Sequence, residues 1–226
     1  MTRFTHNGKY LSFDGLQIMI PKKTLRTGLI AEYLFNGNAD DTSGSGYNGT
    51  SVNNPTLVAD RNGVPNSAYD FNGIDQYIDI QGVDLNDIFN NNFTVSVWFK
   101  QNIQNTNKNI FTYRDAYQDG FRVAIDPINY LDLQYNSMWV FGGPYTSTGW
   151  THVLGVRNGY SLSLYINNIL VKTENISSQP PINVTNNLKF ATDSTKNSGE
   201  FNGSLDNIRI YDRFLSPEEI TQLYNE

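Results

Sequence analysis

The sequence predicts an all-β protein: a two-sheet antiparallel sandwich with one short helix at its C-terminal end. Short runs of alternating apolar and polar residues follow one another along most of the chain, as in half-buried strands. Asn-Gly and Asp-Gly accept the positive φ angles of tight hairpin turns, and a bulky aromatic residue suits a pleated surface. An aromatic residue precedes such a dipeptide four times, at Phe13-Asp14-Gly15, Phe35-Asn36-Gly37, Phe71-Asn72-Gly73 and Phe201-Asn202-Gly203.

The composition is that of a soluble globular chain. Its 226 residues are 38% hydrophobic, 13% aromatic and 17% charged, which is enough apolar material for a core. There is no cysteine, so disulfides and thiolate metal sites are excluded. No apolar run reaches the length of a membrane span or of a signal peptide. We therefore expect no membrane insertion and no encoded export signal.

Charge divides the chain into two parts. Residues 1–28 contain five Lys or Arg and one acid, whereas the remaining residues contain 11 bases and 21 acids. This split predicts a basic N-terminal β arm, residues 1–27, attached to an acidic domain, residues 28–226. The acidic domain would repel a polyanion, so we expect no nucleic-acid partner. An ordinary first strand pair with solvated lysines is the alternative interpretation of the arm.

The arm itself reads as a hairpin. Its strands are expected at Lys9–Phe13 and Leu16–Ile20, on either side of the Asp14-Gly15 turn. An isolated two-stranded hairpin is marginally stable in water. We therefore expect the arm to pack on its own domain or on another chain.

Within the domain, the run Phe93–Lys100 alternates apolar and polar residues and so predicts one buried face. Leu162–Ile166 and Ile169–Val171 predict a hairpin through Asn167-Asn168, because Asn tolerates left-handed conformations. Further strands are expected at Tyr77–Ile80, Phe121–Ile125, Tyr130–Tyr135, Thr151–Arg157, Asn187–Ala191 and Leu205–Tyr211.

The one expected helix begins at Ser216. Ser216 as N-cap, Pro217 at the first helical position and Glu219 together form a capping-box pattern, with acids near the positive end of the helix dipole. Ile220 and Leu223 then share one face. The pattern predicts a terminal helix that clips across the sandwich.

Seven stretches along the chain form an ordered set of motifs: Ala31–Gly44, Ala68–Gly73, Phe93–Phe99, Trp150–Val153, Leu164–Asn168, Gly203–Tyr211 and Leu215–Ile220. In this order they resemble the laminin G-like (LamG) branch of the concanavalin A-like jelly rolls. The resemblance covers residues 28–226 and implies a two-sheet jelly-roll sandwich. Two positions depart from the family pattern. Asn168 replaces the usual Gly, and Asn207 stands where a second Asp is common after Asp206.

The same resemblance implies a structural calcium ion. It would be held by Asp41, by Asp206 and by the backbone carbonyl of Gly46, since hard cations take carboxylate and carbonyl oxygens. Asn207 removes one acidic ligand from this set. The alternative is that the loop around Asp41 is only an Asx turn.

Catalysis is not expected. Glycoside hydrolysis in such sandwiches needs two carboxylates about 5 Å apart, and Glu32, Glu174 and Glu200 each stand alone. His152 has no neighbouring group in the sequence that would activate it, so a hydrogen-bonded strand histidine is the expected role.

Sugar recognition needs aromatic platforms beside polar groups. Segments that mix rings with hydrogen-bonding groups nominate Tyr113, Tyr117, Trp139 and Tyr145 as glycan-binding residues, with core or plain strand surface as the alternative.

The functional hypothesis is a non-catalytic virion surface protein, such as a bacteriophage head fibre, decoration or tail protein. Residues 1–27 would dock on other virion chains or support a homo-oligomer, and the LamG-like domain would recognise a cell-surface glycan. The absence of a signal peptide and the charge split favour this virion or extracellular location. A secreted carbohydrate-binding module of a bacterial enzyme or adhesin is the alternative, and a glycoside hydrolase is the third.

Overall fold

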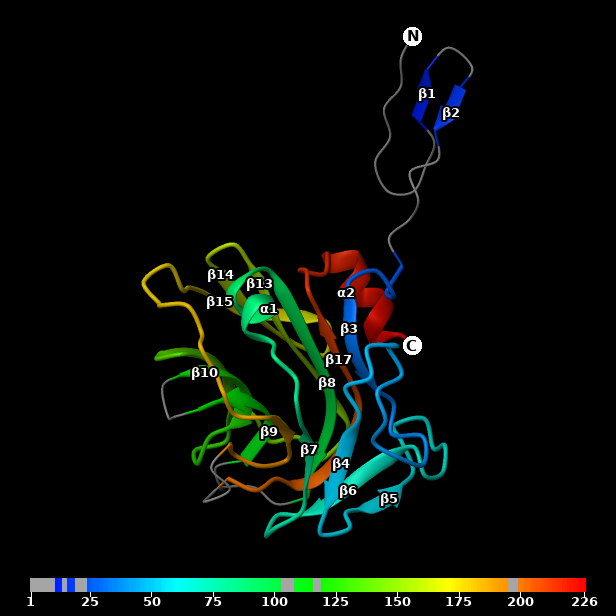
Figure 1. The fold of residues 1–226 in the computed structure, drawn as a ribbon, viewed down its shortest axis with the longest axis vertical. Coiled ribbons are helices and arrows are strands. Elements are labelled where there is room, and N and C mark those ends of the chain that lie inside the picture. The colour runs from blue at the N-terminus through cyan, green and yellow to red at the C-terminus, as the bar shows by residue number, and fades with distance from the viewer. Residues whose placement is uncertain (1–10, 14–15, 19–23, 103–107, 116–118, 195–198) are drawn as a thin grey trace.

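The computed structural model describes residues 11–13, 16–18, 24–102, 108–115, 119–194 and 199–226. In these residues the chain forms two large sheets stacked as a sandwich, with every strand pair antiparallel (Figure 1). The predicted fold class, a two-sheet antiparallel sandwich with a short C-terminal helix, is confirmed.

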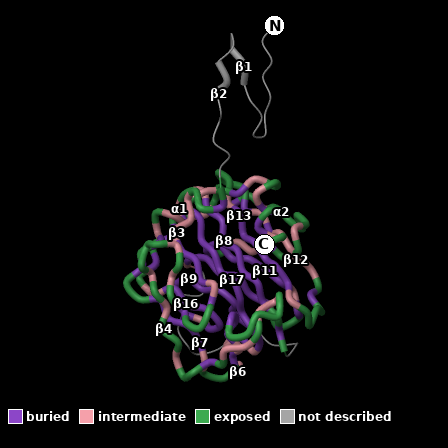
Figure 2. The backbone as a smooth tube through the Cα atoms, turned by 90° about the vertical axis from the view of Figure 1, so that its right-hand side faces the viewer, coloured by how far each residue is buried: buried purple, intermediate pink, exposed green. Residues whose placement is uncertain are grey.

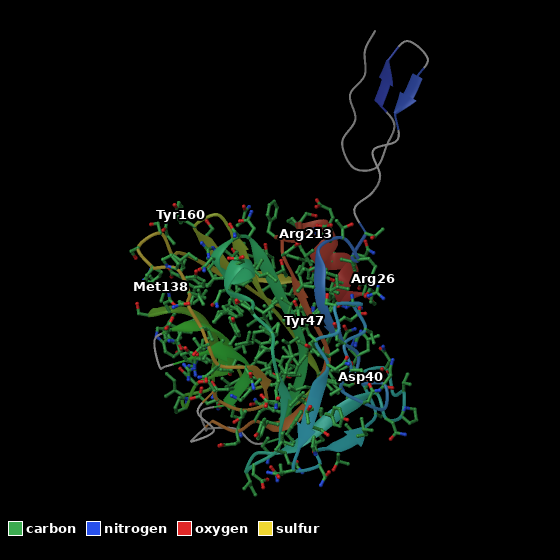
Figure 3. All side chains as sticks on the ribbon, in the orientation of Figure 1. Arg26, Asp40, Tyr47, Met138, Tyr160 and Arg213 are labelled. Atoms are coloured by element: carbon green, nitrogen blue, oxygen red, sulfur yellow. The ribbon has the colours of Figure 1, made fainter. Side chains whose placement is uncertain are left out.

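The first sheet has seven strands. In spatial order they are β12 (Met138–Pro144), β11 (Tyr130–Tyr135), β10 (Gly120–Ile125), β9 (Lys108–Arg114), β16 (Leu188–Phe190), β7 (Tyr77–Ile80) and β4 (Gly49–Val52). β12 and β4 are therefore its edges. Met138, at the start of β12, and Asp40 lie on opposite sides of the sandwich (Figure 3).

The second sheet has eight strands. In spatial order they are β15 (Ile169–Asn175), β14 (Ser161–Ile166), β13 (Thr151–Asn158), β8 (Phe93–Gln101), β17 (Asn202–Tyr211), β6 (Ala68–Asn72) and β5 (Thr56–Val58), while β3 (Leu29–Tyr33) pairs β17 off this path. β17 joins the whole sheet. One of its edges pairs β8 along its length, and the other pairs β6 first and then β3.

Two strands and two short helices complete the description. β1 (Leu11–Phe13) and β2 (Leu16–Ile18) pair antiparallel, with Phe13 opposite Leu16, and so form the expected hairpin. Helices α1 (Asn86–Asn90) and α2 (Pro217–Tyr224) are five and eight residues long. Neither could cross a membrane.

The main core lies between the two sheets. Strand alternation directs Phe93, Val95, Val97 and Phe99 of β8 inward, and all four are fully buried, as the sequence predicts. Rings from both sheets meet there, for example Phe93 of β8 and Phe121 of β10 at 5.0 Å between centroids. Buried strands consequently fill the centre of the molecule, and exposed residues gather in the loops (Figure 2).

A second, smaller cluster places α2 on the outer face of the eight-stranded sheet. Ile220 and Leu223 pack there against Leu154 and Val156 of β13. The predicted capping box is present, since Ser216 Oγ accepts from Glu219 N and the Glu219 side chain accepts from Ser216 N. Leu25 joins this cluster, so the chain is already packed on the sandwich before residue 28.

The predicted turns have different outcomes. Asn167 and Asn168 have φ angles of 48° and 65° and connect β14 to β15, which confirms that hairpin. The expected hairpin at Asn202-Gly203 is wrong, because both residues lie in β17 and pair β6. Glycine is needed there for close approach: a Cβ on Gly203 would lie 2.2 Å from the Lys100 carbonyl oxygen.

Candidate functional site

A row of polar side chains crosses the outer face of the seven-stranded sheet. Successive cross-strand pairs are Asp79–Lys189, Lys189–Thr112, Thr112–Arg122, Arg122–Gln134 and Gln134–Trp139. The row arises because each residue occupies the outward position of its strand, between core residues on either side. It runs from β7 to the aromatic edge at β12.

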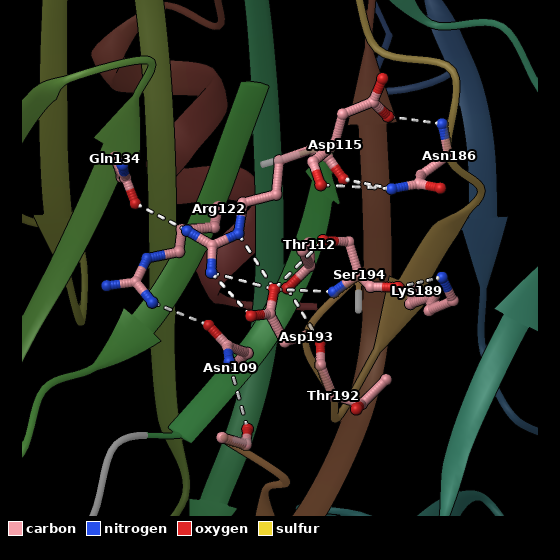
Figure 4. Close-up of polar contacts among 12 residues, drawn as sticks. Asn109, Thr112, Asp115, Arg122, Gln134, Asn186, Lys189, Thr192, Asp193 and Ser194 are labelled. Atoms are coloured by element: carbon pink, nitrogen blue, oxygen red, sulfur yellow. Dashed lines mark hydrogen bonds and ion pairs between the residues drawn. The ribbon is translucent and has the colours of Figure 1, made fainter. Parts of the chain in front are cut away.

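Most of this row is buried, although it lies outside the main core. The segment after β16, residues 191–194, covers it. Arg114 binds both carboxylate oxygens of Asp193, and Thr112 Oγ1 donates to the Thr192 carbonyl at 3.0 Å (Figure 4). Lys189 Nζ donates to the Ser194 carbonyl at 2.9 Å. The segment after β16 therefore covers the outer face of the seven-stranded sheet, as α2 covers the outer face of the eight-stranded sheet.

Arg122 and Asp132 form a buried ion pair on this face without a hydrogen bond between them. Asp132 is fully buried, and its carboxylate lies 3.7 Å from Arg122 Nη2. Within the described residues neither oxygen of Asp132 accepts a hydrogen bond. Burial raises the pKa of Asp132 to about 7, and the nearby Arg122 charge only partly opposes this. Asp132 is thus a carboxylic acid at mildly acidic pH.

Three aromatic side chains form a platform at the β11–β12 edge. Trp139 and Phe141 are stacked, with nearly parallel ring planes (5°) and ring centroids 5.7 Å apart, and Tyr130 meets Phe141 edge-on at 6.5 Å. Phe141 is 48% exposed, and Tyr130 and Trp139 are half-buried. The Arg122 guanidinium lies 4.5 Å from the Trp139 ring centroid and holds that ring by a cation–π contact.

Of the three predicted glycan-binding residues that the structure describes, only Trp139 lies on this platform. Tyr113 is buried. It points into the core because it lies two residues after Phe111 on β9 and therefore shares the inward face of that strand. Its hydroxyl accepts from Leu85 N, and burial raises its pKa to about 12. Tyr145 is also buried, packs on Phe99 at 5.3 Å and bonds Thr151 Oγ1. Tyr117 lies outside the described residues.

Tyr113 and Tyr145 therefore cannot serve as ligand platforms in this fold. For Tyr113 the sequence contained a signal, because its two-residue spacing from the apolar Phe111 is typical of neighbours on the buried face of a strand. Tyr130 and Phe141 complete the platform and were missed. Their sequence signal is outward spacing: Phe141 lies two residues after Trp139, and Tyr130 lies two before Asp132.

The residues proposed for calcium do not fit a calcium site. Asp41 accepts hydrogen bonds from the backbone N–H groups of Glu32, Ser43 and Tyr47 and from Ser43 Oγ, at 2.9–3.1 Å. Burial alone would raise the pKa of Asp41, but these bonds outweigh it and lower the pKa. The alternative Asx-turn interpretation therefore describes this loop, since its carboxylate is already saturated by donors.

Asp206 is engaged elsewhere. Its Oδ2 accepts from Arg61 Nη1 at 2.6 Å, and burial raises its pKa to about 6 against the opposing effect of Arg61. Gly46 is in the left-handed region, with a φ of 81°. Among the residues described, no group of three or more His, Asp or Glu side chains is placed to hold a metal ion.

His152 has the structural role that the sequence predicts. It is fully buried, with Nε2 2.7 Å from Ser96 Oγ. Its Nδ1 has no hydrogen-bond partner in the described part of the chain, so no carboxylate orients the ring for Ser96. Burial, aided by Arg61 and Arg209, lowers its pKa to about 3 and keeps the ring neutral.

Structural comparisons agree on this architecture. Domain 4 of AbnA, an extracellular arabinanase of glycoside hydrolase family 43 from Geobacillus stearothermophilus, solved with arabinotriose, is 22% identical with a TM-score of 0.65. The match covers 87% of this chain and 98% of that domain. The binding domain of Paraclostridial Mosquitocidal Protein 1 gives a TM-score of 0.74 at 17% identity. The match covers 89% of this chain and 53% of the mosquitocidal chain.

The binding domain of botulinum neurotoxin DC, solved with rat synaptotagmin II, gives a TM-score of 0.70 at 17% identity. The match covers 89% of this chain and 52% of the neurotoxin chain. The chain thus spans about half of these toxin domains. A search of curated proteins gives no match. The family model of the concanavalin A-like lectin/glucanases superfamily matches residues 71–221, well over half of the sequence. The chain belongs to the concanavalin A-like lectin/glucanases superfamily.

Proposed function

We propose that the domain is a non-catalytic glycan-binding module whose ligand lies on the platform formed by Tyr130, Trp139 and Phe141. The observation that carries the proposal is the stacked Trp139–Phe141 pair at the sheet edge, where Phe141 is 48% exposed. An exposed aromatic face can pack against the apolar face of a sugar ring. The Tyr130 ring lies beside Phe141, and its hydroxyl can bond sugar hydroxyls.

The platform is supported from behind before any ligand arrives. Arg122 holds Trp139, and its Nη1 donates to Asn109 Oδ1 at 2.9 Å. A ring already fixed in its binding orientation loses little freedom on binding, which favours affinity. Arg122 and Asp132 thus act by positioning the platform.

One structural neighbour supports a glycan as the ligand class, since the arabinanase domain was solved with arabinotriose. The two toxin domains are binding domains and support a binding role in general. The carboxylates support binding over hydrolysis, because hydrolysis needs two of them on either side of one glycosidic bond. On this face Asp193 bonds Arg114, Asp79 bonds Asn187 and Asp132 lies beside Arg122.

A glycan array tests the platform. We expect Trp139→Ala and Phe141→Ala each to weaken binding about tenfold or more, since removal of a central aromatic contact has that size of effect. Phe214→Ala is the matched control, because Phe214 is 41% exposed and is not part of this platform. Binding that survives both platform substitutions contradicts the proposal. Release of new reducing ends from a bound glycan contradicts the non-catalytic part.

For the biological setting, we propose that residues 1–27 attach the domain to another chain, as on a virus particle such as a bacteriophage. The basic excess of this arm and its β1–β2 hairpin support an attachment role. Light scattering should show a larger assembly for the full chain than for a variant lacking residues 1–20, which keeps Leu25 beneath α2. If the full chain and the truncated variant are both monomers, the result instead favours the secreted-module alternative.

A further inference from the structure

We propose a second glycan site, on the opposite sheet, that takes one neutral sugar residue. It is a hollow on the outer face of the eight-stranded sheet, beside the C-terminal end of α2. The inference goes beyond the proposed function, because the hollow shares no residue with the Trp139 platform.

The hollow has a volume of about 290 Å³, close to the lower end of the range for small-molecule sites. It contains two of the three tryptophans of the chain. The residues that line it are Arg61, Asn62, Trp98, Trp150, Tyr224, Asn225 and Glu226. Trp98 from β8 and Trp150 just before β13 share this face because His152, opposite Trp98 in register, also points outward.

The floor of the hollow is rigid. The Trp98 ring stacks on His152 at 4.7 Å and 12° and on Tyr224 at 5.5 Å and 17°, and the Arg61 guanidinium lies 4.7 Å from its centroid. Trp150 differs from Trp98, because it is half-buried and makes no ring contact or hydrogen bond with any described residue. A large aromatic ring that lines a hollow without a partner is available to stack on a ligand.

The polar groups of the hollow match a hydroxyl-rich ligand. Within the described chain, the indole N–H groups of Trp98 and Trp150 and the side-chain amide of Asn62 have no hydrogen-bond partner. The Asn225 amide donates to the Thr221 carbonyl, and its oxygen can still accept. Sugar hydroxyls can both donate and accept, so one sugar ring could satisfy donors and acceptors of this mixed set together.

The charges around the hollow are already paired. Arg61 bonds Asp206 at 2.6 Å, and Glu226 at the rim bonds Arg209 at 2.6 Å. A charged ligand would have to compete with one of these pairs, whereas a neutral sugar leaves both intact. The geometry therefore points to neutral glycans, and sialylated or uronic-acid glycans are excluded from this site.

The test uses the full chain with Trp139→Ala, which removes the platform, on an array of neutral, sialylated and uronic-acid glycans. We expect binding to neutral glycans to persist, and Trp150→Ala or Asn62→Ala added to this background to weaken it about tenfold or more. Tyr160→Ala, 64% exposed, is the control. The retained glycan should also change tryptophan emission, and this change should vanish with Trp150→Ala. Unchanged thermal unfolding of each variant shows that the fold persists.

Three outcomes would overturn the second site. These are loss of all neutral-glycan binding in Trp139→Ala, retention of that binding in both Trp150→Ala and Asn62→Ala, and retention of acidic glycans only. The two proposals fail separately. Wild-type binding that is indifferent to Trp139→Ala but sensitive to Trp150→Ala sinks the platform and keeps the hollow.

Discussion

The outer faces of the two sheets bury polar groups in different ways. On the eight-stranded sheet, α2 supplies Ile220 and Leu223 as an apolar cover, and the charges beside it are hydrogen-bonded, as in Arg61–Asp206. On the seven-stranded sheet, the segment after β16 supplies the cover mainly through Asp193 and backbone carbonyls.

Asp132 on the seven-stranded sheet is buried and accepts no hydrogen bond from the described residues, whereas Asp206 on the eight-stranded sheet accepts one from Arg61. A buried acid that lacks donors is costly to ionise, so Asp132 destabilises the fold as pH rises, whereas the buried neutral His152 on the eight-stranded face does so as pH falls. The helix cover itself acts through apolar contact area.

The largest expected effect tests the helix cover. Ile220→Ala should lower the free energy of unfolding by about 3 kcal/mol, because Ile220 is fully buried and its truncation leaves a cavity. Thermal and denaturant unfolding measure this change. Gln222→Ala, on the exposed side of the same helix, is the control. A loss below about 1 kcal/mol would mean that α2 is dispensable, and that the two covers do not differ as described.

A smaller effect tests the unsatisfied acid. The folded-state pKa of Asp132 lies above its unfolded value, so its contribution to stability is present at low pH and is lost as pH rises toward 7. Asp132→Asn removes the ionisation. We expect the variant to match the wild type near pH 4 and to exceed it by on the order of 2 kcal/mol at pH 8.

The comparison between variant and wild type at each pH is the necessary measurement. His152 has a lowered pKa, so its contribution runs the other way and is lost as pH falls below its unfolded value. That contribution is common to both proteins and cancels in the difference. If Asp132→Asn is instead less stable at pH 8, the attraction between Arg122 and Asp132 outweighs burial.

The smallest expected effect concerns calcium. Because backbone N–H groups and Ser43 saturate Asp41, and Arg61 occupies Asp206, we expect no change in melting temperature between calcium and a chelator. Differential scanning calorimetry of the full chain measures this. A calcium-dependent rise that Asp41→Asn abolishes would restore the calcium site implied by the family resemblance.

Local patterns in the sequence predicted much of this fold. The alternation in Phe93–Lys100 located β8 and its buried face, and the Ser216 capping box located α2. These predictions succeeded because strand pleat and helix capping depend on near neighbours. β9 and β12 were missed as strands, and with them the inward direction of Tyr113 and the outward direction of Phe141.

Strand pleats, the Asn167-Asn168 turn, the helix cap and, through the ordered motifs, the sandwich class can all be predicted from residues close together in the chain. Which aromatic rings reach the surface and which charges meet depends on contacts between distant segments. Arg61 and Asp206 are 145 residues apart, and β17 brings residues of β6, β8 and β3 together. Such contacts follow from strand register and packing, which no local window of sequence contains.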